Sequence, residues 1–257
     1  MIDFNQSAQY TLSIRLSTDG FSFSVFNPHS EEKPLYYDRE VNTTLSLTAN
    51  LKQTFREVEW LNNPFRKVHV LIASPRFTFI PLEYFEDEQT DLVFYYNQTQ
   101  RENEVVLYNI LHRNNIVVLF GIDKSCHSFL LEKHSNAHFY AQASPFIDFF
   151  ANKSRLGNNR KLYAYLHSHA IDLYSYERSR LLLGNSFQCR DIHDKLYYLL
   201  YTWKQLGLDQ ERDEIHLSGM LHEKNELLAE LKKYIRQVYI MNPSANIDLE
   251  AIVHLGD

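Results

Sequence analysis

The sequence predicts an α/β protein of two similar lobes, each a mixed β-sheet that opens with a β-hairpin and is flanked by helices. The main observation is a repeat, because the pattern of residues 12–25 returns without gaps at residues 162–175. In both copies apolar residues alternate, stop at a short polar turn and alternate again, which is typical of a hairpin with one buried face. A second observation is that both copies are followed by the same succession of a third strand, a helix and a further strand.

The first half contains the first copy of this succession. Three strands are predicted, and the helix after them has apolar residues at spacings of three and four before Asn62-Asn63-Pro64 ends it. The predicted elements are strands 10–16, 21–27 and 35–41, a helix over 47–61, a strand over 68–73 and a short extended piece that ends at Pro81.

The second half repeats this order. Asp191 is the expected N-cap of its helix, and Gly207 stands where a left-handed residue should end it. The predicted elements are strands 162–166, 171–176 and 180–187, a helix over 192–206, a strand over 215–217 and a last helix with Leu221, Leu228, Leu231, Ile235 and Val238 facing inward. The strand over 215–217 matches residues 68–70 at an offset of 147 rather than 150.

The predicted domains are a first lobe over residues 1–151 and a second lobe over 152–257. The first lobe includes an inserted segment, about 83–151, with a buried strand over 115–121, a helix over 125–134 capped by Ser125, and a short helix over 145–150. This insertion begins with five acidic residues between Glu83 and Asp91, which are expected in a solvated loop or at a helix start.

Composition limits the classes of function. The 257 residues are 44% hydrophobic and 23% charged, as in a soluble globular protein, and the net charge of −6 opposes binding to nucleic acid or to an anionic membrane. The first residues lack a signal-peptide pattern and no apolar run is long enough to span a bilayer, so we expect a cytoplasmic protein without membrane insertion. Only 7 glycines are present, which leaves few positions where the backbone can closely approach a phosphate.

The order of elements resembles the actin-like ATPase fold, a ribonuclease H-like fold shared by actin, sugar kinases and heat-shock chaperones. The segment Ala73-Ser74-Pro75-Arg76-Phe77-Thr78-Phe79-Ile80-Pro81 is similar to one in an uncharacterised bacterial family with this fold. The resemblance implies a ligand cleft between two lobes. In active members ATP lies there, each first hairpin holds phosphates through backbone N–H groups, and an Asp that ends each first strand organises Mg²⁺.

The residues expected for that chemistry are replaced here. Arg15 and Tyr165 stand where the resemblance places the two aspartates, and Ser17 and His167 stand where it places glycines. The adenosine-binding turn, Leu217-Ser218-Gly219-Met220, keeps one glycine. The candidate nucleotide or ligand cleft therefore consists of Arg15, Ser17, Thr18, Asp19, Gly20, His167, Ser168, His169, Ser218 and Gly219.

The preferred hypothesis is a non-catalytic binding or assembly protein on a degenerate actin-like scaffold, with a protein partner and no cofactor. Tyr198 and Tyr201 lie off the apolar stripe of their helix and are candidates for a protein contact. The alternative is a nucleotide-binding protein or slow ATPase that uses ATP and Mg²⁺ with atypical phosphate loops.

Two further sites remain open as weaker alternatives. His167 and His169 face the same way on a strand end and would bind Zn²⁺ if a third ligand joined them, although two polar turn residues are the simpler interpretation. Cys126 at a helix start would have a lowered pKa if exposed, but a buried, inert thiol is the expectation.

Overall fold

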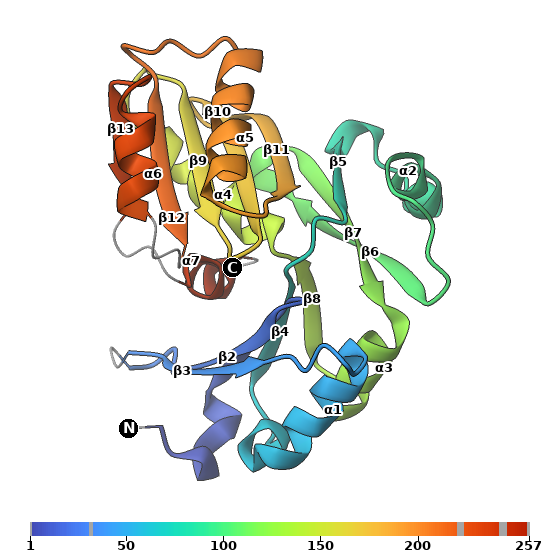
Figure 1. The fold of residues 1–257 in the computed structure, drawn as a ribbon. Coiled ribbons are helices and arrows are strands. Elements are labelled where there is room, and N and C mark those ends of the chain that lie inside the picture. Colours follow the sequence, from blue (N-terminus) through green and yellow to red (C-terminus); the bar gives the residue numbers. More distant parts are fainter. Residues whose placement is uncertain (1, 31–32, 220–223, 242–245, 256–257) are drawn as a thin grey trace. The chain divides into compact units, whose positions relative to one another are not determined.

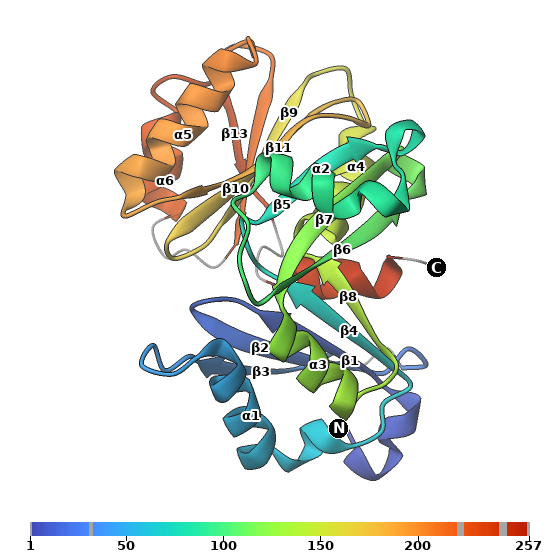
Figure 2. The same cartoon turned by 90° about the vertical axis from the view of Figure 1, so that its right-hand side faces the viewer.

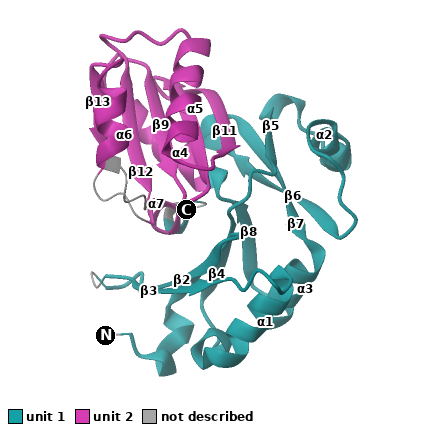
Figure 3. Ribbon diagram, viewed as in Figure 1, with its two compact units in different colours: residues 1–144, 252–257 teal, residues 145–251 magenta. Residues whose placement is uncertain are grey.

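The chain forms two compact units in the computed structural model, which describes residues 2–30, 33–219, 224–241 and 246–255. One unit comprises Met1–Ser144 with Ile252–Asp257, and the other comprises Pro145–Ala251 (Figure 3). The change from one unit to the other lies inside helix α4 (Ala143–Ser154), whereas the sequence placed the boundary after residue 151.

The first unit is built on a five-stranded mixed sheet with the order β3-β2-β1-β4-β8. Its first three strands are antiparallel, and β4 and β8 are added in parallel. Helices α1 and α3 lie side by side on one face of this sheet (Figures 1 and 2). These elements are β1 (Thr11–Leu16), β2 (Gly20–Phe26), β3 (Leu35–Glu40), β4 (Lys67–Ile72), β8 (Ala137–Ala141), α1 (Leu47–Glu57) and α3 (Lys124–Lys133).

Apolar side chains alternate along β1, which gives the sheet one apolar face for helices to cover. Leu12, Ile14 and Leu16 share one face and are completely or almost completely buried. The matching apolar stripe of α1 is also buried, and its Phe55 ring packs edge-on against Phe129 of α3 with 5.3 Å between centroids. Burial of each such side chain contributes about 1.5–3 kcal/mol, so the apolar pattern is sufficient to hold the helices on this face.

The insertion in the first unit forms a separate three-stranded antiparallel sheet, in the order β5-β7-β6, with one short helix. These elements are β5 (Phe77–Pro81), α2 (Thr90–Asn97), β6 (Glu104–Leu111) and β7 (Ile116–Asp123). Phe94 of α2 is fully buried with Val117 and Leu119 of β7. The buried Arg76, just before β5, forms two hydrogen bonds of 2.7 Å with the carboxylate of Glu104, the first residue of β6. These bonds link the start of β5 to the start of β6.

The second unit repeats the first sheet, in the order β11-β10-β9-β12-β13. Its elements are β9 (Lys161–Leu166), β10 (Ala170–Glu177), β11 (Arg180–Gln188), β12 (Glu214–Gly219), β13 (Gln237–Ile240), α5 (Ile192–Gln205), α6 (Lys224–Leu231) and α7 (Ile247–Ala251). Helices α5 and α6 cover one face of the sheet, and α4 lies on the other (Figure 1).

The strand registers confirm the duplication predicted from the sequence. Leu12 pairs with Val25 in the first hairpin, and Leu162 pairs with Ser175 in the second, so both hairpins close in the same register. Leu12 also pairs with Val68, and Leu162 with Ile215, which reproduces the predicted offset of 147. The three missing positions are therefore absorbed between the hairpin and the parallel strand, without a shift of either strand.

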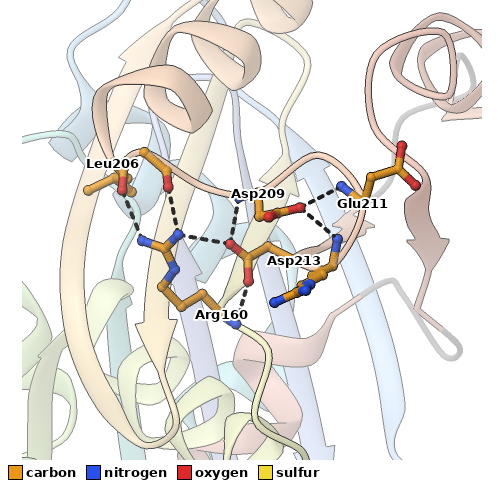
Figure 4. A network of polar contacts seen from close by, with 7 residues as sticks. Arg160, Leu206, Asp209, Glu211 and Asp213 are labelled. Carbon is orange, nitrogen blue, oxygen red and sulfur yellow. Dashed lines mark hydrogen bonds and ion pairs between the residues drawn. The ribbon is translucent and has the colours of Figure 1, made fainter.

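The two ends of α5 agree with the prediction. The Asp191 carboxylate accepts hydrogen bonds from the backbone N–H groups of His193 and Asp194, and Gly207 has a φ of 57° after the last turn. At that end Arg160 donates to the carbonyl oxygens of Leu206 and Gly207 (Figure 4). Arg160 is held in turn by an ion pair of 3.0 Å with Asp213, so the helix terminus is fixed to the start of β9.

Two local predictions were wrong, and three strands were missed. The N-cap of α3 is Asp123, which accepts from the N–H of Cys126, and not Ser125. The last predicted helix ends at Leu231 because the chain turns there and continues as strand β13, which contains Val238. Leu221 of that prediction lies outside the described residues. Strands β6, β8 and β13 were not predicted.

Candidate functional site

The turn of the first hairpin is closed by its own serine. Ser17 Oγ accepts hydrogen bonds from the backbone N–H groups of Asp19 at 3.2 Å and Gly20 at 3.1 Å. The same hydroxyl donates to the carbonyl oxygen of Gly20 at 2.9 Å. In a phosphate-binding turn such N–H groups face the ligand, and here a side chain occupies them. Thr18 and Asp19 are exposed, and Thr18 Oγ1 donates to Asp19 Oδ1 at 3.1 Å.

Arg15 occupies the strand position where the resemblance expects a metal-organising aspartate. It lies opposite Ser22 in the hairpin register, and its Nη2 donates to Ser22 Oγ at 2.7 Å. A guanidinium group carries a positive charge at any physiological pH, so it would repel a divalent cation at this position. The first hairpin thus provides a cation where the chemistry of ATP hydrolysis needs an anion.

The turn of the second hairpin is closed by a contact between a histidine and an aspartate. His167 Nε2 lies 2.7 Å from Asp172 Oδ2, and the side chain of Asp172 is largely buried. Asp172 faces Tyr165 across the hairpin, and the Tyr165 ring packs against Phe146 with 4.6 Å between centroids. The aspartate of this lobe therefore lies on the second strand, where it pairs with a histidine, and a buried aromatic ring takes the first-strand position.

A buried lysine also reaches this turn. Lys195 of α5 is almost fully buried and donates from Nζ to the carbonyl oxygen of Ser168 at 3.0 Å. The carbonyl oxygen of His169 accepts from the N–H of Cys189 at 2.9 Å, while the side chains of Ser168 and His169 are exposed. Asp172 and Lys195 were not identified from the sequence, although the hairpin register would have placed Asp172 opposite Tyr165.

Ser218 and Gly219 lie at the end of β12, beside β9. Ser218 is buried and its hydroxyl donates to the carbonyl oxygen of Ala164 at 2.9 Å. Gly219 has a φ of 96°, and an added Cβ would lie 2.3 Å from the carbonyl oxygen of Leu166. Both residues are engaged with the neighbouring strand. Met220, the last residue of the predicted adenosine turn, lies outside the described residues.

The ten candidate residues thus fall into two groups. Arg15, Ser17, Thr18, Asp19 and Gly20 share the first hairpin, and the other five share the end of β9 and β12 in the second unit. Each group is held together by hydrogen bonds within its own unit. In the first turn Ser17 occupies the backbone N–H groups of Asp19 and Gly20. In the second turn the bonded backbone groups are the carbonyl oxygens of Ser168 and His169.

The alternative metal and thiol sites find no support in the described part of the chain. No group of three or more His, Cys, Asp or Glu side chains there has the arrangement of a metal site. Cys126 is buried, and burial raises the pKa of its thiol to about 11. A thiol with that pKa is protonated at neutral pH and is a poor nucleophile.

The aromatic surface of α5 differs in part from the prediction. Tyr201 is exposed as expected and stacks on the exposed Tyr197, with 5.8 Å between ring centroids. Tyr198 is half-buried, because it stacks on Phe187 of β11 at 4.4 Å. No helix among the described residues has the length and apolar character needed to cross a membrane.

The comparison with protein families finds one match. The family described as "Protein of unknown function (DUF3822)" matches residues 1–238. A search among proteins with curated functions finds no match.

Solved structures identify the fold. A protein from Bacteroides thetaiotaomicron, described as having an actin-like ATPase fold and unknown function, is 56% identical, with 99% of each chain covered and a TM-score of 0.94. A chain of a PilM–PilN type IV pilus biogenesis complex is 11% identical, with a TM-score of 0.57 over 94% of this chain and 89% of that one. The ethanolamine utilization protein EutJ from Carboxydothermus hydrogenoformans is 8% identical, with a TM-score of 0.53 over 96% of this chain and 90% of that one. The chain therefore belongs to the DUF3822 family of unknown function, and it has the actin-like ATPase fold.

Proposed function

We propose that this chain is a non-catalytic binding or assembly protein, in which an actin-like scaffold binds a protein partner and does not hydrolyse ATP. The observation that carries the proposal is the closed turn of the first hairpin, where Ser17 Oγ occupies the N–H groups of both Asp19 and Gly20. A phosphate would have to displace that hydroxyl before it gained these two donors.

The energetic consequence is unfavourable for nucleotide binding. Each hydrogen bond in the turn has a net value of about 0.5–1.5 kcal/mol, so displacement of Ser17 offsets most of what a phosphate would gain from the same donors. Arg15 adds a positive charge at the position expected to organise Mg²⁺. In the second unit the corresponding position is taken by Tyr165, a buried ring. Asp19 in the first turn is exposed and bonded to Thr18, and Asp172 in the second lobe is paired with His167, so neither occupies the first-strand position of a metal-organising aspartate.

The surface best suited to a protein partner is the outer face of α2 with the turns that precede it. Leu92 and Tyr96 are one helical turn apart and are 69% and 89% exposed, which is unusual for large apolar side chains. The preceding segment carries five exposed acids and no base, namely Glu83, Glu86, Asp87, Glu88 and Asp91. An exposed apolar face beside this charge favours a basic amphipathic segment as the partner.

One fold neighbour supports a role in assembly. The chain of the PilM–PilN complex is part of a type IV pilus biogenesis complex, so this architecture occurs in a protein assembly. At a sequence identity of 11%, this similarity supports a shared fold alone. It does not identify the partner or the pathway of this chain.

The first experiment is calorimetric titration of the full chain with ATP and with ADP, each with Mg²⁺. We expect no heat of binding and no thermal stabilisation at millimolar nucleotide. The matched variants are Ser17→Gly, which frees the two N–H groups, and Thr18→Gly, which changes the adjacent exposed residue and leaves the hydroxyl of Ser17 in place. Micromolar binding to the wild-type chain would refute the proposal and support the nucleotide-binding alternative.

A second experiment tests the partner surface. The probe is a fluorescent amphipathic peptide of leucine and lysine at helical spacing, followed by anisotropy. We expect Leu92→Ser with Tyr96→Ser to weaken binding by about tenfold or more, since a few exposed anchors dominate such interfaces. The control is Tyr197→Ser with Tyr201→Ser, which removes a pair of aromatic side chains from α5 that are 59% and 47% exposed. Equal affinities for the two double variants would exclude the α2 face as the binding surface.

A further inference from the structure

The first unit contains a pocket that no feature of the hairpins explains. It has a volume of about 650 Å³ and lies where the 3-10 helix after α1 faces strand β3. We call it the Trp60 pocket, and it is lined by Tyr37, Glu57, Val58, Glu59, Trp60 and Asn63.

Two of these side chains form an aromatic corner. The rings of Trp60 and Tyr37 are inclined at 85° to each other, with 6.2 Å between their centroids. Trp60 is held in place by Phe4, which stacks on it at 4.9 Å, and by the buried Phe23, which it meets edge-on at 6.4 Å. The corner is thus preorganised, and a group placed in it contacts two rings at once.

The charge on the pocket is negative and only partly compensated. Glu57 is bound by the guanidinium of Arg39 and by Gln53 Nε2 at 2.7 Å, so its charge is already matched. The carboxylate of Glu59 is exposed, and no described residue bonds to it. No described lysine or arginine lies over the ring of Trp60 or Tyr37, although such contacts occur at other rings in this chain.

We propose that the Trp60 pocket binds an alkylammonium cation, such as a lysine side chain of a protein partner or a trimethylammonium group. Aromatic faces attract a cation within about 6 Å, Trp most strongly, and the methylene or methyl groups of such a ligand contact the same rings. Glu59 supplies the unmatched negative charge. The described residues that line the pocket include no cation, and the nearby Arg39, which contacts Tyr37, is already bound to Glu57, so an anion would meet Glu59 without a free cation to hold it. A neutral apolar group would leave the Glu59 carboxylate unused.

The pocket is in the first unit and includes no residue of either hairpin turn. The proposal therefore goes beyond the proposed function and stands whether or not the hairpins bind nucleotide.

The test uses the intrinsic fluorescence of the full chain. Of its two tryptophans Trp203 is only 4% exposed, so a ligand added from solution changes the emission of Trp60. The probes are tetramethylammonium and its neutral isostere 3,3-dimethyl-1-butanol, at constant ionic strength. We expect the Trp60 fluorescence to change and to saturate at millimolar tetramethylammonium. The neutral alcohol should bind at least about tenfold more weakly. Trp60→Phe should abolish the signal.

Two variants test whether the charge of Glu59, and not surface acidity in general, contributes to binding of the cation. Glu59→Gln keeps both rings and removes the charge, so it is expected to weaken tetramethylammonium binding by about twofold to fivefold, the range of an exposed charge pair. Glu102→Gln removes an exposed acid elsewhere in the same unit and should have no effect. Parallel titrations with choline and with N-acetyl-lysine methylamide tell the two sources of the cation apart. A response without saturation, equal binding of the neutral alcohol, or an unchanged affinity in Glu59→Gln would overturn the proposal.

Discussion

Gly219→Ala offers a sharp test of why a glycine ends β12. The resemblance to nucleotide-binding proteins attributes such a glycine to a ligand, whereas the structure places it against a neighbouring strand. A methyl group at Gly219 would lie 2.3 Å from the carbonyl oxygen and 2.6 Å from the nitrogen of Leu166, and φ is 96°. Because both contacts are with backbone, no change of rotamer relieves them.

The expected loss of stability follows from these two terms. An L-residue in the left-handed region costs about 1–2 kcal/mol, and an overpacked contact costs about 1–3 kcal/mol more. We therefore expect the free energy of unfolding of the second unit to fall by about 2–5 kcal/mol. Gly207→Ala is the control, because Gly207 also has a positive φ, 57°, and an added Cβ there meets no atom within 4 Å. Its cost should be the conformational term alone, about 1–2 kcal/mol.

Urea denaturation followed by the fluorescence of Trp203 measures both variants. Trp203 is buried in the second unit, and a Trp60→Phe background removes the other tryptophan, which lies in the first. The midpoint of unfolding at an unchanged slope gives the difference in stability. If the two alanine variants have midpoints that agree within error, the contact with Leu166 is not what requires glycine at position 219.

Three other predictions concern burial and capping. Arg76→Ala leaves the buried Glu104 carboxylate without its cation and should cost about 3–5 kcal/mol in urea unfolding, while Arg190→Ala, at an exposed ion pair, should cost less than about 1 kcal/mol. Cys126 should react slowly with iodoacetamide at pH 8 and rapidly in urea, because burial raises the pKa of its thiol to about 11; equal rates would contradict its burial. Asp191→Ala should lower the midpoint of the second unit by the equivalent of about 1 kcal/mol, since the cap of α5 is lost, and an unchanged midpoint would show that the cap is dispensable.

The parts of the fold that were predicted correctly are those with local patterns. Both hairpins, and the parallel strands that begin near Val68 and Ile215, alternate apolar and polar residues or form short apolar runs. Strand β8 was missed because it is only five residues long and its sequence, Ala-His-Phe-Tyr-Ala, does not alternate regularly between apolar and polar residues. Strand β13 was predicted as part of the last helix, because Val238 continues the helical spacing of Leu231 and Ile235. In the structure the chain has already turned before it reaches Val238.

The position of the candidate residues at the hairpin turns was predictable from the sequence, and their contacts were not. The turn residues follow from the repeat, but the bonds from Asp19 and Gly20 to Ser17 depend on one side-chain rotamer. Lys195 reaches a carbonyl oxygen 27 residues away in the sequence, and only the packing of α5 on the second sheet brings the two together. Sequence patterns specify strands and turns, whereas such contacts require the assembled unit.

The two hairpins are closed by unrelated chemistry, a hydroxyl group in one and charged side chains in the other. For protein engineering this means that the two lobes cannot be converted by the same substitution. To install a phosphate loop, a designer would first have to remove a stabilising contact from each lobe. Removing one of these contacts would not supply all the groups that hold a nucleotide. Each unit is therefore better used as a template on which new surfaces are selected than as a starting point for a nucleotide switch.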